Sequence, residues 1–133
     1  MTRINCVPVG ELSRPHLVAE YRELPRVFAL ARKAAERGVV AGPAQYTLGK
    51  GHLLFFYTRL GYLARRHAEL VEEMRRRGYR PAFVEPLARA HANIPAHLWS
   101  DWTPTEAALA LNRQRLAERG AASGPRAAVS SKA

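Results

Sequence analysis

Apolar residues recur at helical spacing in three stretches of the 133-residue sequence, and this pattern constrains the fold more than any other feature. Side chains three or four positions apart share one face of an α-helix, because the helix turns once in about 3.6 residues. No segment alternates apolar and polar residues over a length typical of a strand. The sequence therefore predicts an all-α fold, a single compact three-helix domain with long loops.

The first expected helix covers about residues 14–37. Ser13 is suited to the N-cap, Pro15 falls in the first turn, and Gly38 follows the end. Pro25 lies inside the pattern and removes one backbone donor, so we expect a kink there and not a break. The core-facing stripe consists of Leu17, Tyr21, Leu24, Phe28 and Ala31.

The second expected helix covers about residues 52–77, before Gly78. The third begins at Thr103-Pro104-Thr105-Glu106, where a capping box is combined with proline at the first helical position, and ends near Arg119. We expect loops over residues 39–50 and 80–102. Residues 120–133 are small and polar, so we expect a domain over residues 1–119 and a flexible tail over 120–133.

The charge of the chain points to its partner. Twenty-one Lys and Arg residues stand against 11 Asp and Glu residues, which gives a net charge of +10. Eighteen of the basic residues are arginine, whose side chain binds phosphate with two parallel hydrogen bonds. A GC-rich genome would explain arginine in place of lysine, but it would not explain the scarcity of acidic residues. The composition therefore favours a nucleic-acid partner.

Other classes of protein lack support in the sequence. No apolar run approaches the roughly 20 residues that a membrane helix needs, and no secretory signal is evident. Cys6 is the single cysteine, so no internal disulfide can form. His91, His97 and Asp101 match no metal-site spacing, and we expect neither a metal nor a cofactor. We expect a soluble, intracellular monomer.

Charged residues on the first expected helix divide into two groups on a helical wheel. Arg22, Arg26 and Lys33 fall opposite the apolar stripe, whereas His16 and Glu23 fall at its border. The simplest interpretation is a solvated helix face on which Glu23 is an i, i+3 partner of Arg26. The alternative is a basic DNA-binding strip with one carboxylate and one imidazole at its edge.

Several blocks of the sequence resemble the phage-type pyrimidine-dimer DNA glycosylase family, the dimer-specific enzymes historically called endonuclease V. The longest blocks are HLVAEYRELPRVF at residues 16–28 and LGKGHLLFFYTRL at residues 48–60. The resemblance covers about residues 1–119 and also includes residues 1–5, 94–95, 103–108 and 115–116.

This resemblance implies a nucleophile and a catalytic carboxylate. After removal of Met1, the α-amine of Thr2 attacks C1′ of the 5′ pyrimidine in a cyclobutane dimer. The glycosylic bond breaks, an imine links enzyme and sugar, and β-elimination nicks the strand. Glu23 matches the carboxylate that stabilises the cationic sugar and moves protons. An α-amine suits this role, since its reference pKa of about 7.7–8.0 leaves it easily deprotonated.

The resemblance also implies the binding residues and the substrate, which is double-stranded DNA containing pyrimidine dimers. Residues 120–133 lack the aromatic segment of the family's type member, so two alternatives stay open: the same chemistry on other lesions or abasic sites, and a non-catalytic damage-sensing protein. The residues expected to contact DNA are Arg3, His16, Arg22, Arg26, Lys33, Arg115 and Arg119.

Overall fold

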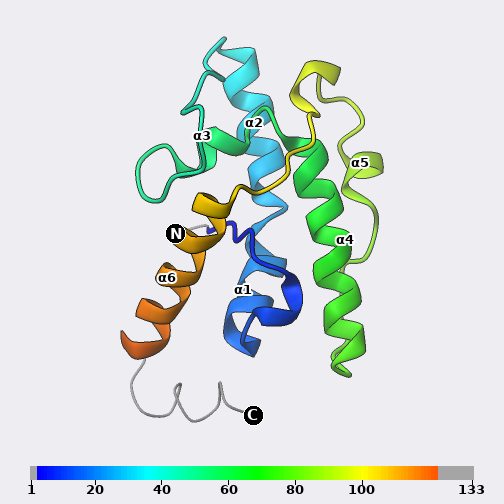
Figure 1. Cartoon of the computed structure of the whole chain (residues 1–133). Coiled ribbons are helices and arrows are strands. Elements are labelled where there is room, and N and C mark those ends of the chain that lie inside the picture. The colour runs from blue at the N-terminus through cyan, green and yellow to red at the C-terminus, as the bar shows by residue number, and fades with distance from the viewer. Residues whose placement is uncertain (1–2, 123–133) are drawn as a thin grey trace.

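The computed structural model describes the backbone of residues 3–122 and the side chains of residues 3–119. Over this part of the chain the fold is helical, as predicted, and the one β-type pairing is an isolated antiparallel bridge between Arg59 and Trp99. Figure 1 shows the α-helices, which are α1 (Arg14–Glu23), α2 (Arg26–Glu36), α3 (His52–Phe56), α4 (Leu60–Arg76), α5 (Leu87–Ala90) and α6 (Glu106–Ala122); the 3-10 turns η1 (Val9–Glu11) and η2 (Ala96–Leu98) complete the fold.

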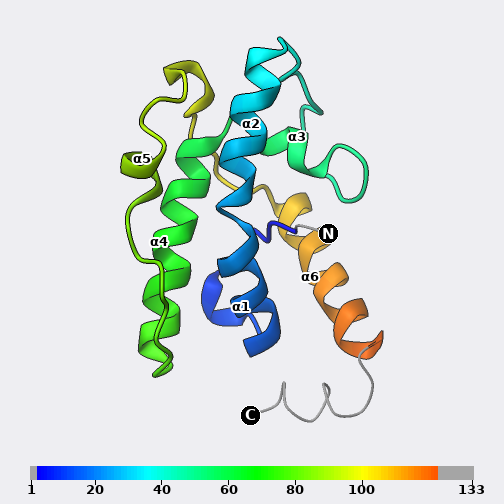
Figure 2. The same cartoon turned by 180° about the vertical axis from the view of Figure 1, so that it is seen from behind.

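The helix predicted over residues 14–37 is present as two successive helices, α1 and α2, so Pro25 does more than kink it. Proline has no N–H to donate. The amides of Val27 and Phe28 bond to carbonyls only three residues back, at 3.1 and 3.3 Å. Leu24 and Pro25 nevertheless keep right-handed helical angles. The prediction of a kink without a break was therefore wrong, although α2 continues roughly in the direction of α1 (Figures 1 and 2).

The helix predicted over residues 52–77 is also interrupted, between α3 and α4. The cause is tertiary: Arg59 pairs with Trp99 in the isolated bridge, and the amide of Tyr62 donates to the carbonyl of Ser100 at 3.2 Å. These contacts draw the start of α4 against the chain before α6. The apolar spacing runs through the break, so it could not reveal the interruption.

The glycines that were expected to end two helices do so. At the end of α2, Gly38 has φ +74°, its amide donates to Ala35, and the amide of Val39 donates to Ala34 at 2.8 Å. This is the pattern of a left-handed C-terminal cap, which favours glycine because a side chain is strained at positive φ. Gly78 ends α4 in the same way, with φ +86°.

The third predicted helix is α6, but its cap differs from the expected one. The hydroxyl of Thr105 accepts a hydrogen bond from the amide of Ala108 at 3.0 Å, so Thr105 is the N-cap and Glu106 is the first helical residue. Thr103 was expected to be the cap, with Pro104 as the first helical residue. Both precede the helix, which corrects that prediction by two residues.

The C-terminal end of α6 lies beyond the expected domain boundary. The helix was predicted to end near Arg119, and it continues to Ala122 through Gly120. The tail predicted over residues 120–133 therefore begins in helix, and its residues 123–133 lie outside the described part of the chain.

The core forms where α1 and α2 pack against α4. Four residues of the predicted stripe, Leu17, Leu24, Phe28 and Ala31, are fully buried, and Tyr21 packs partly buried beside them. From α4 the core receives Leu60, Leu63 and Leu70. Among the described helices, none is long and apolar enough to cross a bilayer.

Candidate active site

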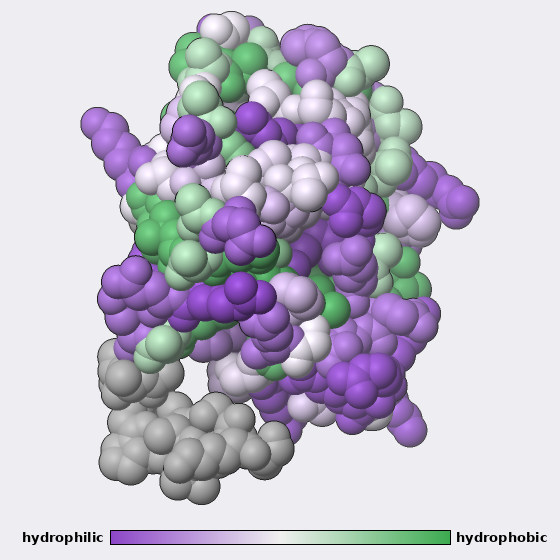
Figure 3. Space-filling view, in the orientation of Figure 1, coloured by the Kyte–Doolittle hydropathy of each residue, from purple (hydrophilic) through white to green (hydrophobic). Residues whose placement is uncertain are grey.

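A pocket of about 140 Å³ opens where the N-terminal segment, α1 and α6 meet. A cavity of about 150 Å³ holds a benzene molecule, so this pocket has room for a group the size of a deoxyribose ring. Hydrophilic residues cover much of the molecular face shown in Figure 3. The charged and titratable side chains that line the pocket are Arg3, His16, Glu20, Glu23, Arg115 and Arg119.

Five of the residues predicted from the sequence meet in this pocket. They are Arg3 from the N-terminal segment, His16 and Glu23 from α1, and Arg115 and Arg119 from α6. The two residues of α6 lie more than 90 positions from the other three in the chain, and only the fold brings the two groups together. These five residues therefore bring three guanidinium groups, an imidazole and a carboxylate to the pocket, in addition to the carboxylate of Glu20.

The other predicted residues have different positions. Arg22, Arg26 and Lys33 are exposed on α1 and α2 and lie outside the pocket wall. Their side chains form a basic strip on the surface, as the helical wheel predicted. The predicted nucleophile, Thr2, lies outside the described residues, but it is bonded to Arg3, which is part of the pocket wall.

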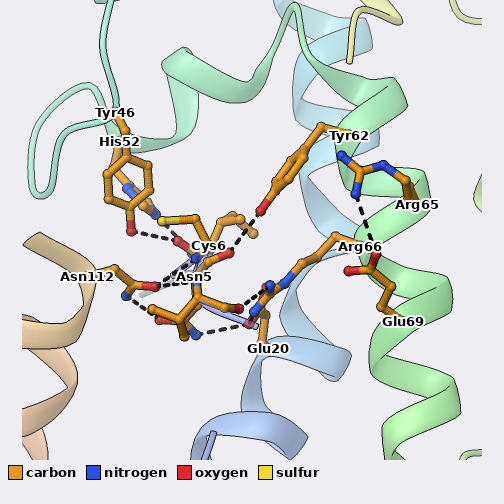
Figure 4. Close-up of polar contacts among 12 residues, drawn as sticks. Asn5, Cys6, Glu20, Tyr46, His52, Tyr62, Arg65, Arg66, Glu69 and Asn112 are labelled. Atoms are coloured by element: carbon orange, nitrogen blue, oxygen red, sulfur yellow. Dashed lines mark hydrogen bonds and ion pairs between the residues drawn. The ribbon is translucent and has the colours of Figure 1, made fainter. Parts of the chain in front are cut away.

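The N-terminal segment, residues 4–7, passes through the interior between α6 and α1 and is held there by side chains (Figures 1 and 4). Asn112 of α6 makes three of these bonds. Its Oδ1 accepts from the amides of Cys6 at 2.7 Å and Val7 at 3.1 Å, and its Nδ2 donates to Oδ1 of Asn5 at 2.8 Å. The side chain of Asn112 thus supplies hydrogen bonds to this extended segment that a neighbouring β-strand would otherwise supply.

On the opposite side of the segment lies a buried ion pair between Glu20 of α1 and Arg66 of α4, each 2% exposed. Arg66 donates to both carboxylate oxygens, Nε to Oε2 at 2.9 Å and Nη2 to Oε1 at 3.1 Å. It also donates to the carbonyl of Val7 at 2.5 Å, while Asn5 Nδ2 donates to Glu20 at 3.0 Å. The pair therefore fixes the segment as well as joining two helices.

The two carboxylates of the pocket wall differ in their burial and in the hydrogen bonds that they accept. Glu20 is buried and receives three hydrogen bonds from Arg66 and Asn5, which leaves it committed to structure. The side chain of Glu23 is 30% exposed and accepts from Nη1 of Arg26 at 3.0 Å. Glu23 is thus both the ion-pair partner that the simplest interpretation predicted and a pocket residue within reach of a bound molecule.

Three arginines and two carboxylates line the pocket, and one of the carboxylates, Glu20, is already paired with Arg66. Burial lowers the pKa of Arg3, and the nearby charges of Arg115 and Arg119 lower it further. Burial also lowers the pKa of His16, with a further contribution from Arg119, so the neutral imidazole is favoured. The hydroxyl of Ser13, expected as a helix cap, instead lies 3.0 Å from Nδ1 of His16. Such a pocket favours an anionic ligand and disfavours a further cation.

Arg3 carries donors that the described protein does not use. Its Nε and Nη1 are buried and have no hydrogen-bond partner among the described residues. A guanidinium is a donor at all five of its N–H groups and accepts nothing. Because a buried donor without a partner is costly, these two nitrogens suit an acceptor that comes from a bound molecule, such as a phosphate oxygen.

Comparison with known proteins bears directly on this site. The family model described as pyrimidine dimer DNA glycosylase matches residues 1–83, which is more than half of the chain. The chain belongs to this family. Membership supports a DNA-repair glycosylase that acts on pyrimidine dimers in DNA. The match includes Arg3, His16 and Glu23 but ends before α6, so it does not cover Arg115 and Arg119, which the fold brings to the same pocket.

Sequence reasoning missed the residues that hold the N-terminal segment. Glu20 and Arg66 did leave a signal, because each lies within the apolar face of its helix. Glu20 is three positions after Leu17, and Arg66 is three positions after Leu63. Opposite charges on two core-facing stripes would have predicted a buried pair. Asn112 left no such signal, since its partners lie more than 100 positions away.

Proposed function

We propose that the protein is a bifunctional DNA glycosylase and abasic-site lyase whose nucleophile is the α-amine of Thr2. The amine attacks C1′ of the 5′ pyrimidine of a cyclobutane dimer, and the glycosylic bond breaks with its electrons leaving on the base, which takes up a proton. The C1′–O4′ bond of the sugar then opens, O4′ takes its electrons and a proton, and the nitrogen forms a double bond to C1′. The resulting imine acidifies the C2′ protons. Removal of one of them expels the 3′ phosphate by β-elimination, which cleaves the strand.

The observation that carries this proposal is the anchoring of the N-terminal segment in the pocket wall. Residues 3, 4 and 5 all line the pocket, and side chains from α1, α4 and α6 hold the segment from residue 5 to residue 7. Chain ends are normally mobile unless they are tied down. A terminus anchored this closely to a positive pocket suits a reacting amine, and family membership supports the same conclusion.

The charges of the pocket also suit the chemistry. A free α-amine has a pKa of about 7.7–8.0, and the positive charges of Arg3, Arg115 and Arg119 would lower that value. More of the amine is then neutral and nucleophilic. Glu23 would stabilise the cationic sugar and the imine, and would carry protons during elimination.

DNA binding would be divided between the pocket and the exposed strip. Within the pocket, the unpartnered nitrogens of Arg3 would bind a phosphate next to the lesion. Outside it, Arg22, Arg26 and Lys33 would contact phosphates along the duplex, because their side chains are exposed on one side of α1 and α2.

Borohydride trapping tests the identity of the nucleophile. Protein with Thr2 as its first residue should form a reducible covalent complex with dimer-containing DNA. Protein that retains Met1, or carries an N-terminal tag, should bind undamaged DNA equally well but form no such complex. Equal trapping by both proteins would exclude the Thr2 amine, and failure of the processed protein to trap would favour a binding protein without lyase chemistry.

A further inference from the structure

Among the described residues, Ile4 is the one nearest to the N-terminus whose backbone is held at both of its polar groups. Its amide donates to Nε2 of His52 at 2.9 Å, and its carbonyl accepts from the hydroxyl of Tyr46 at 3.0 Å. All three residues are buried, with exposed fractions of 1%, 3% and 8% for Ile4, His52 and Tyr46. Figure 4 shows both side chains directed toward the N-terminal segment, Tyr46 from the stretch that leads into α3 and His52 from the first position of α3.

The two contacts depend on particular protonation states. Nδ1 of His52 lies 2.7 Å from the carbonyl of Thr47, which can only accept, so Nδ1 carries the proton and Nε2 is free to accept from Ile4. Burial lowers the pKa of His52, the Thr47 carbonyl raises it, and the charges of Arg3 and Arg115 lower it, with the neutral ring favoured overall. Burial raises the pKa of Tyr46, because it disfavours the charged phenolate, and this keeps the hydroxyl protonated.

We infer that His52 and Tyr46 are positioning residues for the attacking amine: they clamp the peptide groups of Ile4 and so limit the range of the chain end. This inference rests on the proposed role of Thr2. His52 does not line the pocket, and Tyr46 lines it with its hydroxyl already bonded to the carbonyl of Ile4. Their contribution would be to restrict how far the two preceding residues, Thr2 and Arg3, can move away from the pocket.

The number of residues between the last held residue and the amine sets the expected loss of trapping rate. A residue spans at most about 3.5 Å of extended chain, so two residues beyond Ile4 reach at most about 7 Å from it. Without the clamp, the next held residue is Asn5, through its side chain and through its carbonyl, which accepts from the hydroxyl of Tyr62 at 3.4 Å. Three residues beyond it reach about 10 Å. The accessible volume grows with the cube of this distance, so the effective concentration of the amine falls about 3-fold, and loss of orientation lowers it further.

Substitutions that each remove one of the two bonds to Ile4 test the clamp. Tyr46→Phe deletes the hydroxyl but keeps the ring, which packs on Trp102, Phe55 and Phe56. His52→Leu removes the acceptor, whereas His52→Gln supplies an amide oxygen near the position of Nε2. The assay is single-turnover imine trapping at saturating concentrations of DNA with an abasic site, together with the dissociation constant for the same DNA.

We expect the double variant Tyr46→Phe/His52→Leu to lower the trapping rate at least about 3-fold and each single variant to lower it by less, while the dissociation constants change less than about 2-fold, because binding does not need the amine. His52→Gln should recover most of the rate. Val71→Ala is the control for lost stability: Val71 is buried on α4 and belongs neither to the pocket wall nor to the polar network. It should trap at the normal rate below its unfolding temperature.

Hydrogen exchange gives a second measurement that needs no activity. The Ile4 amide should be protected in the unsubstituted protein and exposed in His52→Leu, while the amides within α4 stay protected. Normal trapping by the double variant Tyr46→Phe/His52→Leu, with the unsubstituted protein active, would overturn the positioning role alone. An unsubstituted protein that forms no imine would overturn the proposed function itself. A rate loss that tracks stability equally in Val71→Ala would show that the clamp is only structural.

Discussion

Replacing Arg66 by methionine should destabilise the protein severely, because it leaves a buried carboxylate without its cation. Arg66 donates three hydrogen bonds, two to Glu20 and one to the carbonyl of Val7. After the change Glu20 keeps only the bond from Asn5. Removing one partner of a buried pair costs about 3–5 kcal/mol. For a domain of this size 1 kcal/mol corresponds to roughly 3–4 °C, so we expect Tm to fall by about 10–20 °C.

The neighbouring Arg65 provides a matched control on the same helix. It pairs with Asp101 at 2.8 Å and Glu69 at 3.4 Å, but its side chain is 46% exposed. Exposed pairs contribute about 0–1 kcal/mol, so Arg65→Met should shift Tm by only a few degrees. Urea unfolding followed by circular dichroism, with thermal melts in parallel, measures both variants.

A double variant separates the buried charge from the lost packing. Glu20→Leu combined with Arg66→Met removes both ions, and its cost should be clearly smaller than the sum of the two single costs. If Arg66→Met loses no more stability than Arg65→Met, or if the single costs simply add, the buried pair does not hold the N-terminal segment as described.

Three further outcomes can be measured. Glu23→Gln should lower the single-turnover glycosylase rate far more than the affinity for dimer-containing DNA, because a carboxylate facing a developing cation acts mainly in the transition state. Near-normal turnover would leave it as an ion-pair partner only. Arg22→Ala and Arg26→Ala should each weaken DNA binding and reduce the salt slope by about 1, whereas deleting residues 123–133, which contain two cations and no aromatic residue, should change binding little in the same salt series. The thiol of Cys6, whose pKa burial raises to about 11, should not react with a disulfide reagent at pH 8 until the protein is unfolded; fast reaction of the native protein would contradict its burial.

Local features of the fold were predictable because their causes are local. Gly38 and Gly78 end helices where the sequence placed them, since a left-handed cap favours glycine in any context. The stripe from Leu17 to Ala31 is buried as its spacing indicated. The interruptions near Pro25 and Arg59 were not predictable to the same degree. The second depends on a pairing with Trp99, 40 positions away, and no spacing rule contains that contact.

Some features of the candidate site could likewise be predicted from local sequence, and others could not. The helical wheel placed Arg22 and Arg26 opposite the apolar stripe and Glu23 at its border. In the structure the two arginines are exposed, and Glu23 lines the pocket while it pairs with Arg26. The wheel could not place Arg115 beside Arg3, because helix phase says nothing about which helices are neighbours. The resemblance to a known family supplied that grouping, and the pocket now gives it a physical basis.

The polar network explains how a chain end could serve as a catalytic group. Apolar contacts are non-directional and would let an extended segment slide along its axis, whereas hydrogen bonds to Ile4, Cys6 and Val7 fix its register. The network includes a buried ion pair, and such a pair is often no more stabilising than an apolar replacement of similar size. Its value would then lie in position more than in stability. If the amine of Thr2 reacts as proposed, the variant with both Glu20 and Arg66 replaced by apolar residues should remain folded and bind DNA, yet form the imine slowly. A stable double variant with normal trapping would show that the register of the segment does not limit the reaction.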